Sequence, residues 1–441
     1  MNRRTFLKTA SLASAAVSLP NILRSQGPEG QSANNRLNVA CCGVGGRGYD
    51  AVQGMKGENL VAFCDVDDER AAKSFNEFPN VPRFRDFRQM LEKMGNQIDA
   101  VTVSTPDHMH FPIAMAAIAL GKHVFVEKPL CHTVSETRHL AKAAKDKGVR
   151  SQMGNQGHAG EGCRRLKEWV DGGVLGEVRE VHSWTDRPIW PQGVKAPDHS
   201  KMMPVVQPTL SWDLWLGVAQ PREYDPAYLP FTWRGFWDFG TGALGDMGCH
   251  VMDGTYWALG LTAPTSVVPI LANETDVSGP TASVLRLEFP ARGAMPPVTW
   301  TWYDGGLMPP LPTQLEEGRK LQDDGTILIG SKATVIADTY YDSIRIIPEA
   351  KMKEMAPNLP PKTIPRVVGG HFAEFIRSCK GGPPAGSNFE YSSRLSESVL
   401  IGNIALRARR RIEWDSENLR VTNLESANAF VATQYRPGFG V

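Results

Sequence analysis

The sequence predicts an α/β protein of two domains, the first of which is built on a parallel sheet. Its 441 residues are enough for two domains that each bury a core of their own. In the first third, short apolar runs alternate with helix-like stretches, which is typical of a parallel sheet connected by right-handed crossovers. In the second half, the stretches 177–184, 281–289 and 297–302 are rich in β-forming residues and indicate further strands.

The expected elements of the first third are short and regularly spaced. We expect strands at 38–42, 60–64, 100–104 and 123–126, and helices at 49–55, 87–94, 112–120 and 133–147. Near the C-terminus, 371–378 and 395–411 are also predicted to be helices.

The composition is that of an ordinary globular protein. Apolar residues make up 41% of the chain and charged residues 22%, which argues against disorder. The formal net charge of +1 creates no field that would favour nucleic acid or an anionic membrane as a partner. The seven cysteines have no repeated spacing and form no zinc-type pattern, so neither a disulfide framework nor a zinc site is expected.

The N-terminus carries the pattern of an export signal. Arg3 and Arg4 begin the motif R-R-x-F-L-K, and the weakly apolar run at 9–19 is too short to be a permanent membrane span. This order matches a twin-arginine signal, whereas an ordinary amphipathic arm is the alternative. We therefore expect 1–35 to be a signal and linker, the twin-arginine export machinery to be a partner, and the protein to be periplasmic or otherwise exported.

A G-x-G-x-x-G motif directly follows the first expected strand. Gly43 is expected to make the tight turn, Gly45 to let the backbone approach a pyrophosphate, and Gly48 to let the next helix pack on the strand. Gly46 and Arg47 complete the loop. The phosphates would then meet the positive N-terminus of a helix, so the motif predicts a dinucleotide site in a Rossmann domain over 36–153.

Asp65 ends the second expected strand, about twenty residues beyond the glycines. A carboxylate at this place binds the 2′-hydroxyl of an adenosine ribose and would repel a 2′-phosphate, so NAD is favoured over NADP as the cofactor. The alternative is that Asp65 caps the following helix, although Asp67 and Asp68 could do this instead.

An exported location constrains how such a cofactor is used. The twin-arginine pathway carries folded proteins, so a dinucleotide bound in the cytoplasm can travel with the chain. Because no free dinucleotide pool is expected outside the membrane, the protein must hold its cofactor tightly and return the hydride in each cycle.

Three further motifs identify a family. T-P-D-H stands at 105–108, E-K-P at 127–129, and G-A-L-G-D-M-G-C-H at 242–250. In this order behind the glycine motif, they resemble the glucose-fructose oxidoreductase, inositol dehydrogenase and rhizopine-catabolism family, from Arg36 to about Asn423. The pairing of E-K-P with a downstream D-x-x-x-H is much more specific than the glycines alone.

The resemblance implies the architecture of the rest of the chain. It implies a Rossmann domain followed by an α+β domain with a large, mostly antiparallel, open-faced sheet. This substrate and oligomerisation domain is expected over 154–370, and C-terminal helices and a tail at 371–441 are expected to pack back on the Rossmann domain. Sheets of this type usually form dimers or tetramers, so a homodimer or homotetramer is expected.

Oxidising a secondary alcohol requires a base for the hydroxyl proton and a cation for the developing alkoxide. Asp246 and His250 are four residues apart and share one face of a helix, and histidine is a suitable base at neutral pH. The resemblance implies that His250 takes the proton, that Asp246 binds a hydroxyl or orients the imidazole, and that Lys128 contacts the reacting hydroxyl beside the nicotinamide. Glu127 would position Lys128, and Pro129 would follow a cis bond. The alternative for the pair is a helix cap and a satisfied core histidine.

The resemblance also places cofactor contacts at two other strand ends, on Thr105, Pro106, His108 and Asn155. Gln156 follows at the place where relatives touch nicotinamide or substrate. Although Asp107, His108 and His110 could suggest a metal site, the family uses this strand end beside the cofactor, so no metal is predicted.

Two aromatic stretches are candidates for substrate binding. The first holds Trp184, Arg187 and Trp190, and the second, just before the D-x-x-x-H helix, holds Trp237. Arginines among aromatic rings suit a carbohydrate, including one that carries a carboxylate, but both stretches could equally be domain packing.

These observations predict an exported NAD-dependent oxidoreductase that oxidises a secondary hydroxyl of a sugar, glycoside or polyol with a tightly bound cofactor. One alternative within the family is redox-neutral glycoside hydrolysis through a 3-keto intermediate. Another is a non-catalytic carbohydrate-binding or sensor protein on the same scaffold. The sequence leaves the choice open.

Overall fold

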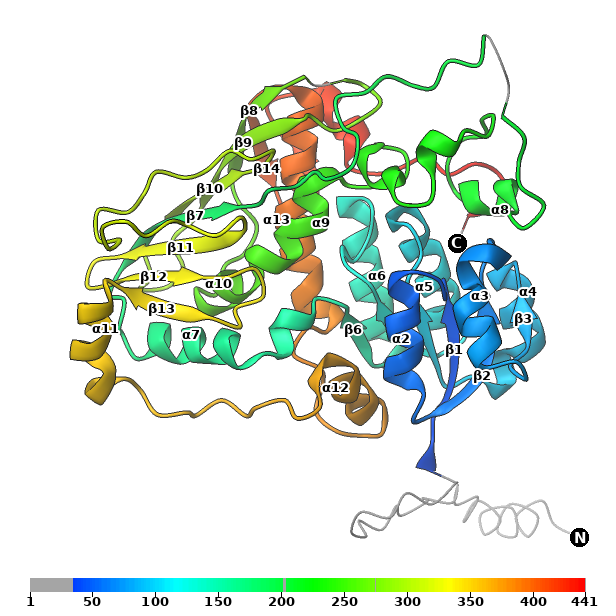
Figure 1. The fold of residues 1–441 in the computed structure, drawn as a ribbon, viewed down its shortest axis with the longest axis horizontal. Helices are drawn as coiled ribbons and strands as arrows, with labels where there is room; N and C mark the ends of the chain where they lie inside the picture. The colour runs from blue at the N-terminus through cyan, green and yellow to red at the C-terminus, as the bar shows by residue number, and fades with distance from the viewer. Residues whose placement is uncertain (1–34, 201–203, 274, 441) are drawn as a thin grey trace, which may run out of the picture. The chain divides into compact units, whose positions relative to one another are not determined.

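The computed structural model describes residues 35–200, 204–273 and 275–440. The predicted export signal lies outside the described residues. Leu37–Val441 form one unit, which contains two sheets (Figure 1).

The first sheet has six parallel strands in the order β3-β2-β1-β4-β5-β6. Its strands are β1 (Asn38–Cys42), β2 (Asn59–Cys64), β3 (Arg83–Phe84), β4 (Ala100–Val103), β5 (His123–Val126) and β6 (Ser151–Met153). Its helices are α2 (Arg47–Met55), α3 (Asp68–Glu77), α4 (Phe87–Met94), α5 (His110–Ala119) and α6 (Val134–Lys147). The parallel sheet and each element predicted in this part of the chain are confirmed.

The strand order of this sheet fixes where a ligand can bind. β1 lies between β2 and β4, so successive connections leave it on opposite sides, and a crevice opens at the carboxyl ends of these strands. β1, β4 and β5 are almost wholly buried because helices cover both faces of the sheet, which explains their continuous apolar runs.

The second sheet has nine strands in the order β13-β12-β11-β7-β10-β9-β8-β14-β15. Its strands are β7 (Val178–Trp184), β8 (Ser266–Ala272), β9 (Ala282–Phe289), β10 (Val298–Tyr303), β11 (Gly325–Gly330), β12 (Thr334–Ala337), β13 (Ile344–Ile347), β14 (Ile412–Asp415) and β15 (Arg420–Val421). β7 and β10 pair in parallel and the other neighbours pair antiparallel, so the predicted mostly antiparallel sheet is confirmed.

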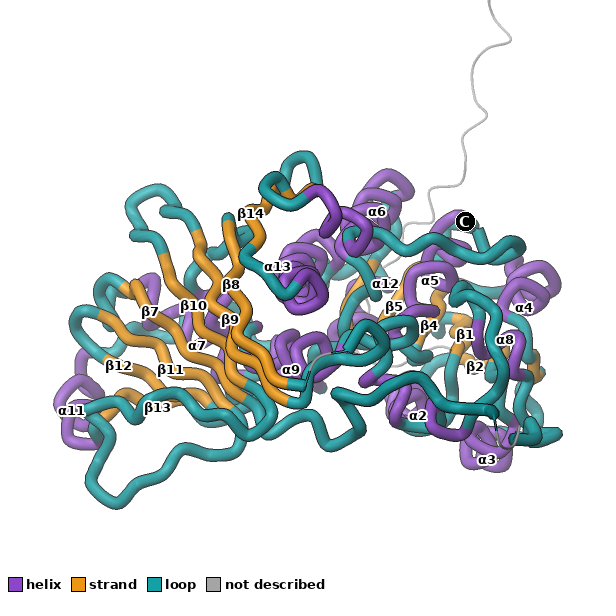
Figure 2. Tube along the Cα trace, turned by 90° about the horizontal axis from the view of Figure 1, so that it is seen from above, coloured by secondary structure: helices purple, strands orange, loops and turns teal. Residues whose placement is uncertain are grey.

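The remaining helices pack around this second sheet and between the two sheets. They are α7 (Glu161–Asp171), α8 (Trp212–Leu216), α9 (Gly242–Val251), α10 (Asp253–Ala258), α11 (Glu349–Met355), α12 (Gly370–Cys379) and α13 (Phe389–Ala408). Figure 2 shows α9 and α13 on the side of the second sheet that faces the first. Within the described ranges, no helix has the length and apolar character needed to span a membrane.

Helix α13 joins the two halves. It packs on α6 of the first half and on α9 and β8 of the second. The contact with α9 is close, because a Cβ on Gly248 would lie only 2.9 Å from the side chain of Val399. Ser396 Oγ of α13 also accepts a hydrogen bond from the Leu130 backbone N–H, 3.4 Å away, just beyond β5. The position of α9 relative to the first sheet is therefore set by α13.

A long irregular stretch between β7 and α9 returns to the first sheet. We call residues 204–241 the covering segment; it contains α8 and the short turns η5 (Pro226–Tyr228) and η6 (Thr232–Gly235). The Asp68 N–H donates to the Thr209 carbonyl at 3.0 Å, and the Ser211 N–H donates to the Val66 carbonyl at 2.8 Å. Figure 1 shows α8 beside the helices of the first sheet.

Candidate active site

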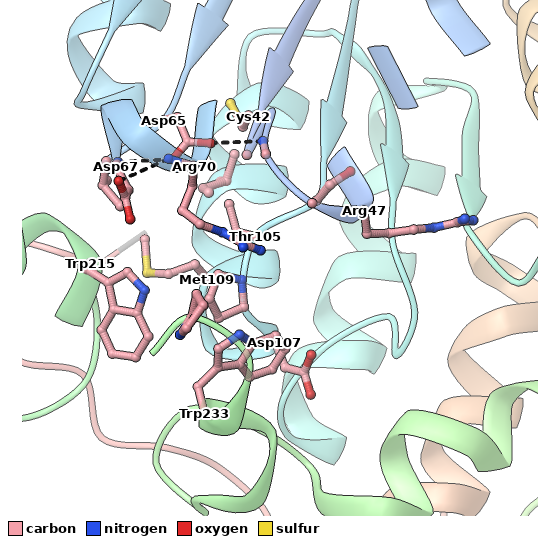
Figure 3. A pocket seen from close by; sticks show the side chains of 18 of the residues that line it. Cys42, Arg47, Asp65, Asp67, Arg70, Thr105, Asp107, Met109, Trp215 and Trp233 are labelled. Carbon is pink, nitrogen blue, oxygen red and sulfur yellow. Dashed lines mark hydrogen bonds between the residues drawn. The ribbon is translucent and has the colours of Figure 1, made fainter. Parts of the chain in front are cut away.

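A cavity of about 420 Å³ opens at the carboxyl ends of β1, β2 and β4 (Figure 3). On one side it is lined by the strand ends and the glycine loop, and on the other by the covering segment. The predicted residues that line it are Gly43, Gly45, Gly46, Arg47, Asp65, Thr105, Pro106, Glu127, Lys128 and Asp246. The structure thus brings most of the predicted cofactor residues together in the crevice that the strand order creates.

The glycine loop is packed too closely for side chains. Gly43 has a φ of 72°, and a Cβ there would lie 2.6 Å from the Ser104 carbonyl oxygen. A Cβ on Gly48 would lie 1.9 Å from the Gly43 carbonyl oxygen, so α2 packs directly against its own loop. A Cβ on Gly45 would lie 2.5 Å from the Arg70 carbonyl oxygen. Gly45 is therefore needed for packing on α3, a reason that the sequence did not reveal.

The carboxylate of Asp65 is built into this loop. Its Oδ2 accepts hydrogen bonds from the backbone N–H groups of Val44, at 2.8 Å, and Gly45, at 3.3 Å, and its Oδ1 accepts from that of Asp67 at 3.1 Å. Burial raises the pKa of Asp65, and these backbone donors oppose that shift. The alternative that Asp65 caps α3 is wrong, because the Asp67 side chain accepts the N–H groups of the first turn.

Two arginines that the sequence reasoning missed line the same end of the cavity. Arg70 is on α3, and one of its guanidinium nitrogens lies 2.9 Å from the place of a Cβ on Gly46. Arg85 follows β3 and pairs with Asp68. Both look like ordinary surface charges in the sequence, and only the fold brings them to Asp65.

Lys128 and Asp246 form an ion pair across the two halves of the molecule. Lys128 follows β5, in a turn whose Lys128–Pro129 bond is cis, and Asp246 is on α9. The Lys128 Nζ donates to Asp246 Oδ1 at 2.6 Å and to the Asp246 carbonyl at 2.9 Å. Burial alone would raise the pKa of Asp246, but the charges of Lys128 and Arg234 outweigh burial and lower this pKa to about 2.

His250 lies one helical turn after Asp246 and is only 6% exposed. Its ring meets the Tyr340 ring edge-on, with 5.0 Å between centroids, and its Nδ1 has no hydrogen-bond partner among the described residues. Burial lowers the pKa of His250 well below its usual value, and the Lys128 charge lowers it further, so the ring is neutral at pH 7. His250 does not line the cavity, so its predicted role as base and the alternative of a core histidine both stay predictions, of which the unpaired nitrogen favours the first.

Glu127 contacts the glycine loop. Its buried carboxylate accepts a hydrogen bond from Arg47 Nε at 3.1 Å, and burial raises the pKa of Glu127. The predicted role was to position Lys128. The ion pair with Arg47 ties the E-K-P turn to the start of α2, and Lys128 also acts on the Glu127 carboxylate through its charge and its backbone N–H, so the predicted role stays a prediction.

The two histidines after β4 hold segments together. The His108 ring nitrogens lie 3.1 Å from the Trp215 carbonyl and 3.3 Å from the Phe239 carbonyl, so this side chain anchors the covering segment and does not line the cavity. Burial lowers the pKa of His108 to about 3. His110 lies between the carbonyls of Thr105 and Pro129, at 2.9 and 2.8 Å. No group of three potential metal ligands is found in the part of the chain that the structure describes.

Several buried polar atoms at the strand ends have no hydrogen-bond partner among the described residues. They include Ser104 Oγ and Thr105 Oγ1 after β4, and Asn155 Nδ2 after β6. Buried polar atoms usually have partners, so unpaired ones grouped at strand ends fit the hydroxyls, amide and phosphates of a bound dinucleotide. Gln156 is half-buried at the start of the next turn and does not line the cavity.

Like Gln156, the four residues predicted from the aromatic stretches to bind substrate do not line the cavity. Trp184 is buried in the second half and its Nε1 donates to the Gln322 carbonyl at 2.8 Å. Trp237 is buried with the Arg407 guanidinium 5.7 Å from its ring. Arg187 pairs with Asp186. Trp190 is buried against Phe231, which lines the cavity, and does not line the cavity itself. Each was predicted from composition, which does not show which way a side chain faces.

Other residues of the covering segment do line the cavity. Arg234 lies over the rings of Phe231, at 4.4 Å, and Trp233, at 4.3 Å, and its Nε is 3.4 Å from Asp246 Oδ1.

Asp107, after β4 in the first half, also lines the cavity. It is 5% exposed and its Oδ2 accepts a hydrogen bond from Thr241 at 2.7 Å. Burial raises the pKa of Asp107 to about 6. Asp107 stands in the T-P-D-H motif, and Arg234 stands in the aromatic stretch before the D-x-x-x-H helix. Within that stretch, the sequence gave no reason to choose Trp233 over Trp237.

Comparisons with known proteins agree with this geometry. Residues 37–155 match the model of an oxidoreductase family with an NAD-binding Rossmann fold, and residues 160–441 match that family's C-terminal α/β domain. The chain is similar to levoglucosan dehydrogenase of Pseudarthrobacter phenanthrenivorans, with 25% identity over 198 residues, which are 45% of the chain and 42% of that protein. It is also similar to a glycosyl hydrolase family 109 protein of Shewanella, with 29% identity over 170 residues, which are 33% of the chain and 37% of that protein. The chain thus spans less than half the length of these curated relatives.

The fold is shared with a solved dehydrogenase. The WlbA dehydrogenase from Bordetella pertussis, in complex with NADH and UDP-GlcNAcA, superposes with a TM-score of 0.58 at 18% identity, covering 86% of this chain and 99% of that one. Together, the two family matches span nearly all of the chain beyond Arg36. The chain therefore belongs to the Gfo/Idh/MocA oxidoreductase family, with its NAD-binding Rossmann fold and its C-terminal α/β domain.

Proposed function

We propose that the chain is an exported NAD-dependent oxidoreductase that oxidises a secondary hydroxyl of a sugar, glycoside or polyol and keeps its cofactor bound. The observation that carries the proposal is the contact of Lys128 with Asp246, one helical turn from the neutral His250, beside a glycine loop with an Asp65 carboxylate. These are the cation, the base and the cofactor site that alcohol oxidation requires.

Lys128, His250 and Asp246 each carry out one part of the proposed alcohol oxidation. Bound NAD would supply the hydride acceptor. Lys128, held by Asp246, donates a hydrogen bond to the substrate oxygen and stabilises the negative charge that develops there. The neutral ring of His250 takes the hydroxyl proton onto a ring nitrogen. Asp246 keeps its charge at any pH above about 2, so the Lys128 ammonium stays oriented over the working range.

The lining of the cavity supports a polyhydroxylated substrate. Asp107, Asp246 and Arg234 offer acceptors and donors for neighbouring hydroxyls, and Phe231 and Trp233 offer flat apolar faces. Flat rings beside a few directed polar groups are typical of sites for small polar ligands. The names of the relatives, levoglucosan dehydrogenase and a glycosyl hydrolase family 109 protein, point to the same substrate class.

A second candidate is redox-neutral hydrolysis of a glycoside, in which the same hydride is removed and then returned. The similarity to a glycosyl hydrolase family 109 protein favours this candidate. In both candidates the hydride would leave the cofactor again in each cycle, either to a second sugar that is reduced or back to the same sugar. Neither candidate then consumes external NAD, which suits the proposed exported location and the twin-arginine signal.

The test starts from purified full-length protein without added cofactor. Denaturation should release NAD, and adding sugars or aryl glycosides to the native protein should change absorbance in the reduced-nicotinamide band. A change that persists indicates a dehydrogenase, and release of the aryl group with no net change indicates hydrolysis. If the protein neither carries nor binds a dinucleotide, and its absorbance responds to no sugar, the proposal is overturned and the alternative of a non-catalytic carbohydrate-binding protein is favoured.

A further inference from the structure

One end of the cavity is closed by two segments that are distant in the sequence. At the Asp65 end, the lining includes Leu214 and Trp215 of the covering segment and Phe439 of the C-terminal tail. We call residues 206–219 and 435–439 together the clasp. The clasp faces Met109 and Ile113 of the first half, and these side chains make this end of the cavity apolar.

The covering-segment part of the clasp is attached next to Asp65. Leu210 forms a β-bridge with Asp67, with one hydrogen bond on each side, from Ser211 to Val66 and from Asp68 to Thr209. The attachment begins at Val66, the residue directly after Asp65. A ligand bound to the Asp65 carboxylate therefore lies immediately beneath this segment.

Trp215 presents a fixed ring to the cavity. Its ring stacks on Trp212 at 5.0 Å and packs edge-on against Phe239 at 4.8 Å, and its carbonyl lies against the His108 ring. In Figure 3, Trp215 lies beside Met109, on the other side of the cavity from Asp65. A flat ring and a thioether across the cavity from the Asp65 carboxylate match what a stacked purine requires when Asp65 binds the ribose.

The tail part of the clasp is held by buried arginine contacts. Arg436 is 8% exposed and donates to both the Asp213 carboxylate and the Asp213 carbonyl at 2.6 Å, as well as to the Gly217 carbonyl. Phe439 lies between the Arg436 and Arg88 guanidinium groups, 4.6 and 4.2 Å from its ring. Arg88 of α4 also donates to the Gly438 carbonyl at 2.7 Å. The tail thus links α8 to α4 across the mouth of the cavity.

We infer that the clasp encloses the adenosine half of the dinucleotide, with Trp215 and Phe439 in contact with it, so that cofactor enters or leaves only when the tail detaches. This inference rests on the proposed function and adds the device that would keep the cofactor bound. A gate slows entry as well as exit, whereas a weakened contact speeds exit alone. The clasp is therefore distinguishable from an ordinary binding surface.

The test measures NADH association and release on full-length protein by stopped-flow fluorescence, with Arg436→Ala and Phe439→Ala as variants. Loss of the Arg436 hydrogen bonds should make release at least about tenfold faster. Association should also become faster. The matched control is Arg420→Ala, an exposed arginine in the same C-terminal region, which should keep wild-type rates. A conservative Trp215→Phe variant, which keeps a flat ring, should release NADH more slowly than Trp215→Ala.

The outcomes of this test distinguish a failure of the clasp from a failure of the proposed function. If the wild-type protein binds no NADH, the proposed function itself is overturned. If the wild-type protein binds NADH but both tail variants associate and release it at wild-type rates, the clasp is overturned and the proposed function survives. Faster release without faster association, or equally faster rates in the control Arg420→Ala, would also overturn the gate.

Discussion

The two walls of the cavity are built in opposite ways. The strand-end wall leaves hydrogen-bonding capacity unused on the hydroxyls of Ser104 and Thr105. The covering segment contributes mainly rings: Trp212 Nε1 donates to the Arg222 carbonyl at 2.9 Å, and the Arg234 guanidinium lies against two aromatic rings while its Nε faces Asp246. Buried polar groups are costly unless paired, so the unpaired hydroxyls of the strand-end wall fit a polar ligand, whereas the covering segment supplies flat rings and one guanidinium.

The largest effect is expected from Lys128→Met. The substitution removes the cation that stabilises the developing alkoxide and leaves the Asp246 carboxylate buried without it, so kcat should fall by about 10²- to 10³-fold. Steady-state kinetics measure the loss, and a titration should show that NADH still binds. Lys147→Met, at an exposed position on α6, is the control. More than a tenth of wild-type kcat in Lys128→Met would mean that the reaction does not occur at this wall.

His250→Gln should lower kcat/KM by about 10²-fold, because the amide cannot take the hydroxyl proton. The pH profile of an Asp107→Asn variant tests the same role, because this substitution removes the cavity carboxylate whose pKa is about 6. Since the pKa of His250 is well below its usual value, the ring stays neutral as pH falls, and kcat/KM of this variant should remain flat through pH ~6.5. His139→Gln, at an exposed position on α6, should leave kcat/KM unchanged. A profile that declines with an apparent pKa of about 6.5 would argue against this environment.

His108, which anchors the covering segment to the strand ends, should make the stability of the protein depend on pH in the acid range. The pKa of His108 is about 3 in the folded protein, and a histidine in an unfolded chain has a pKa near 6.5. Between these values the unfolded chain binds a proton that the folded chain does not, so stability falls as pH falls. In urea unfolding between pH ~6.5 and ~5, His108→Gln should lose this dependence, about 1.4 kcal/mol per pH unit. Comparison with the wild type is needed because Asp107, with a raised pKa, acts in the opposite sense in both proteins. Equal slopes would contradict the assignment.

The smallest effect distinguishes two tryptophans of the covering segment. Trp233 lines the cavity and Trp237 does not, so Trp233→Leu should raise KM for the sugar by about fivefold. Trp237→Leu should leave KM unchanged and lower the free energy of unfolding by about 2 kcal/mol, because its ring is core. Equal changes in KM would show that the covering segment moves when substrate binds.

The sequence predicted those parts of the molecule that depend on local chemistry. A glycine loop, a carboxylate at a strand end and a helix with D-x-x-x-H each have a meaning that needs few neighbours, and the structure then brings Lys128 to within 2.6 Å of Asp246 across 118 positions. Strands β8 and β11 to β15 were not predicted, because the motifs that identified the family do not extend to them.

The covering segment could not be predicted for a different reason. It has no regular periodicity, so nothing in the sequence shows that Trp233 faces the cavity and Trp237 the core. Arg70 and Arg436 look like solvated charges, yet one lines the cavity and the other is buried in the tail. Their positions depend on contacts between segments distant in the sequence, which local patterns do not encode.

The central position of α13 has a consequence for how the protein works. Because this one helix packs on α6, α9 and β8 and bonds to the backbone just beyond the E-K-P turn, neither half can swing against the other without breaking a shared core. The lysine and the carboxylate that holds it are therefore aligned once, when the chain folds, rather than in every catalytic cycle. The free energy of sugar binding is therefore not needed for that alignment and can instead lower the activation barrier.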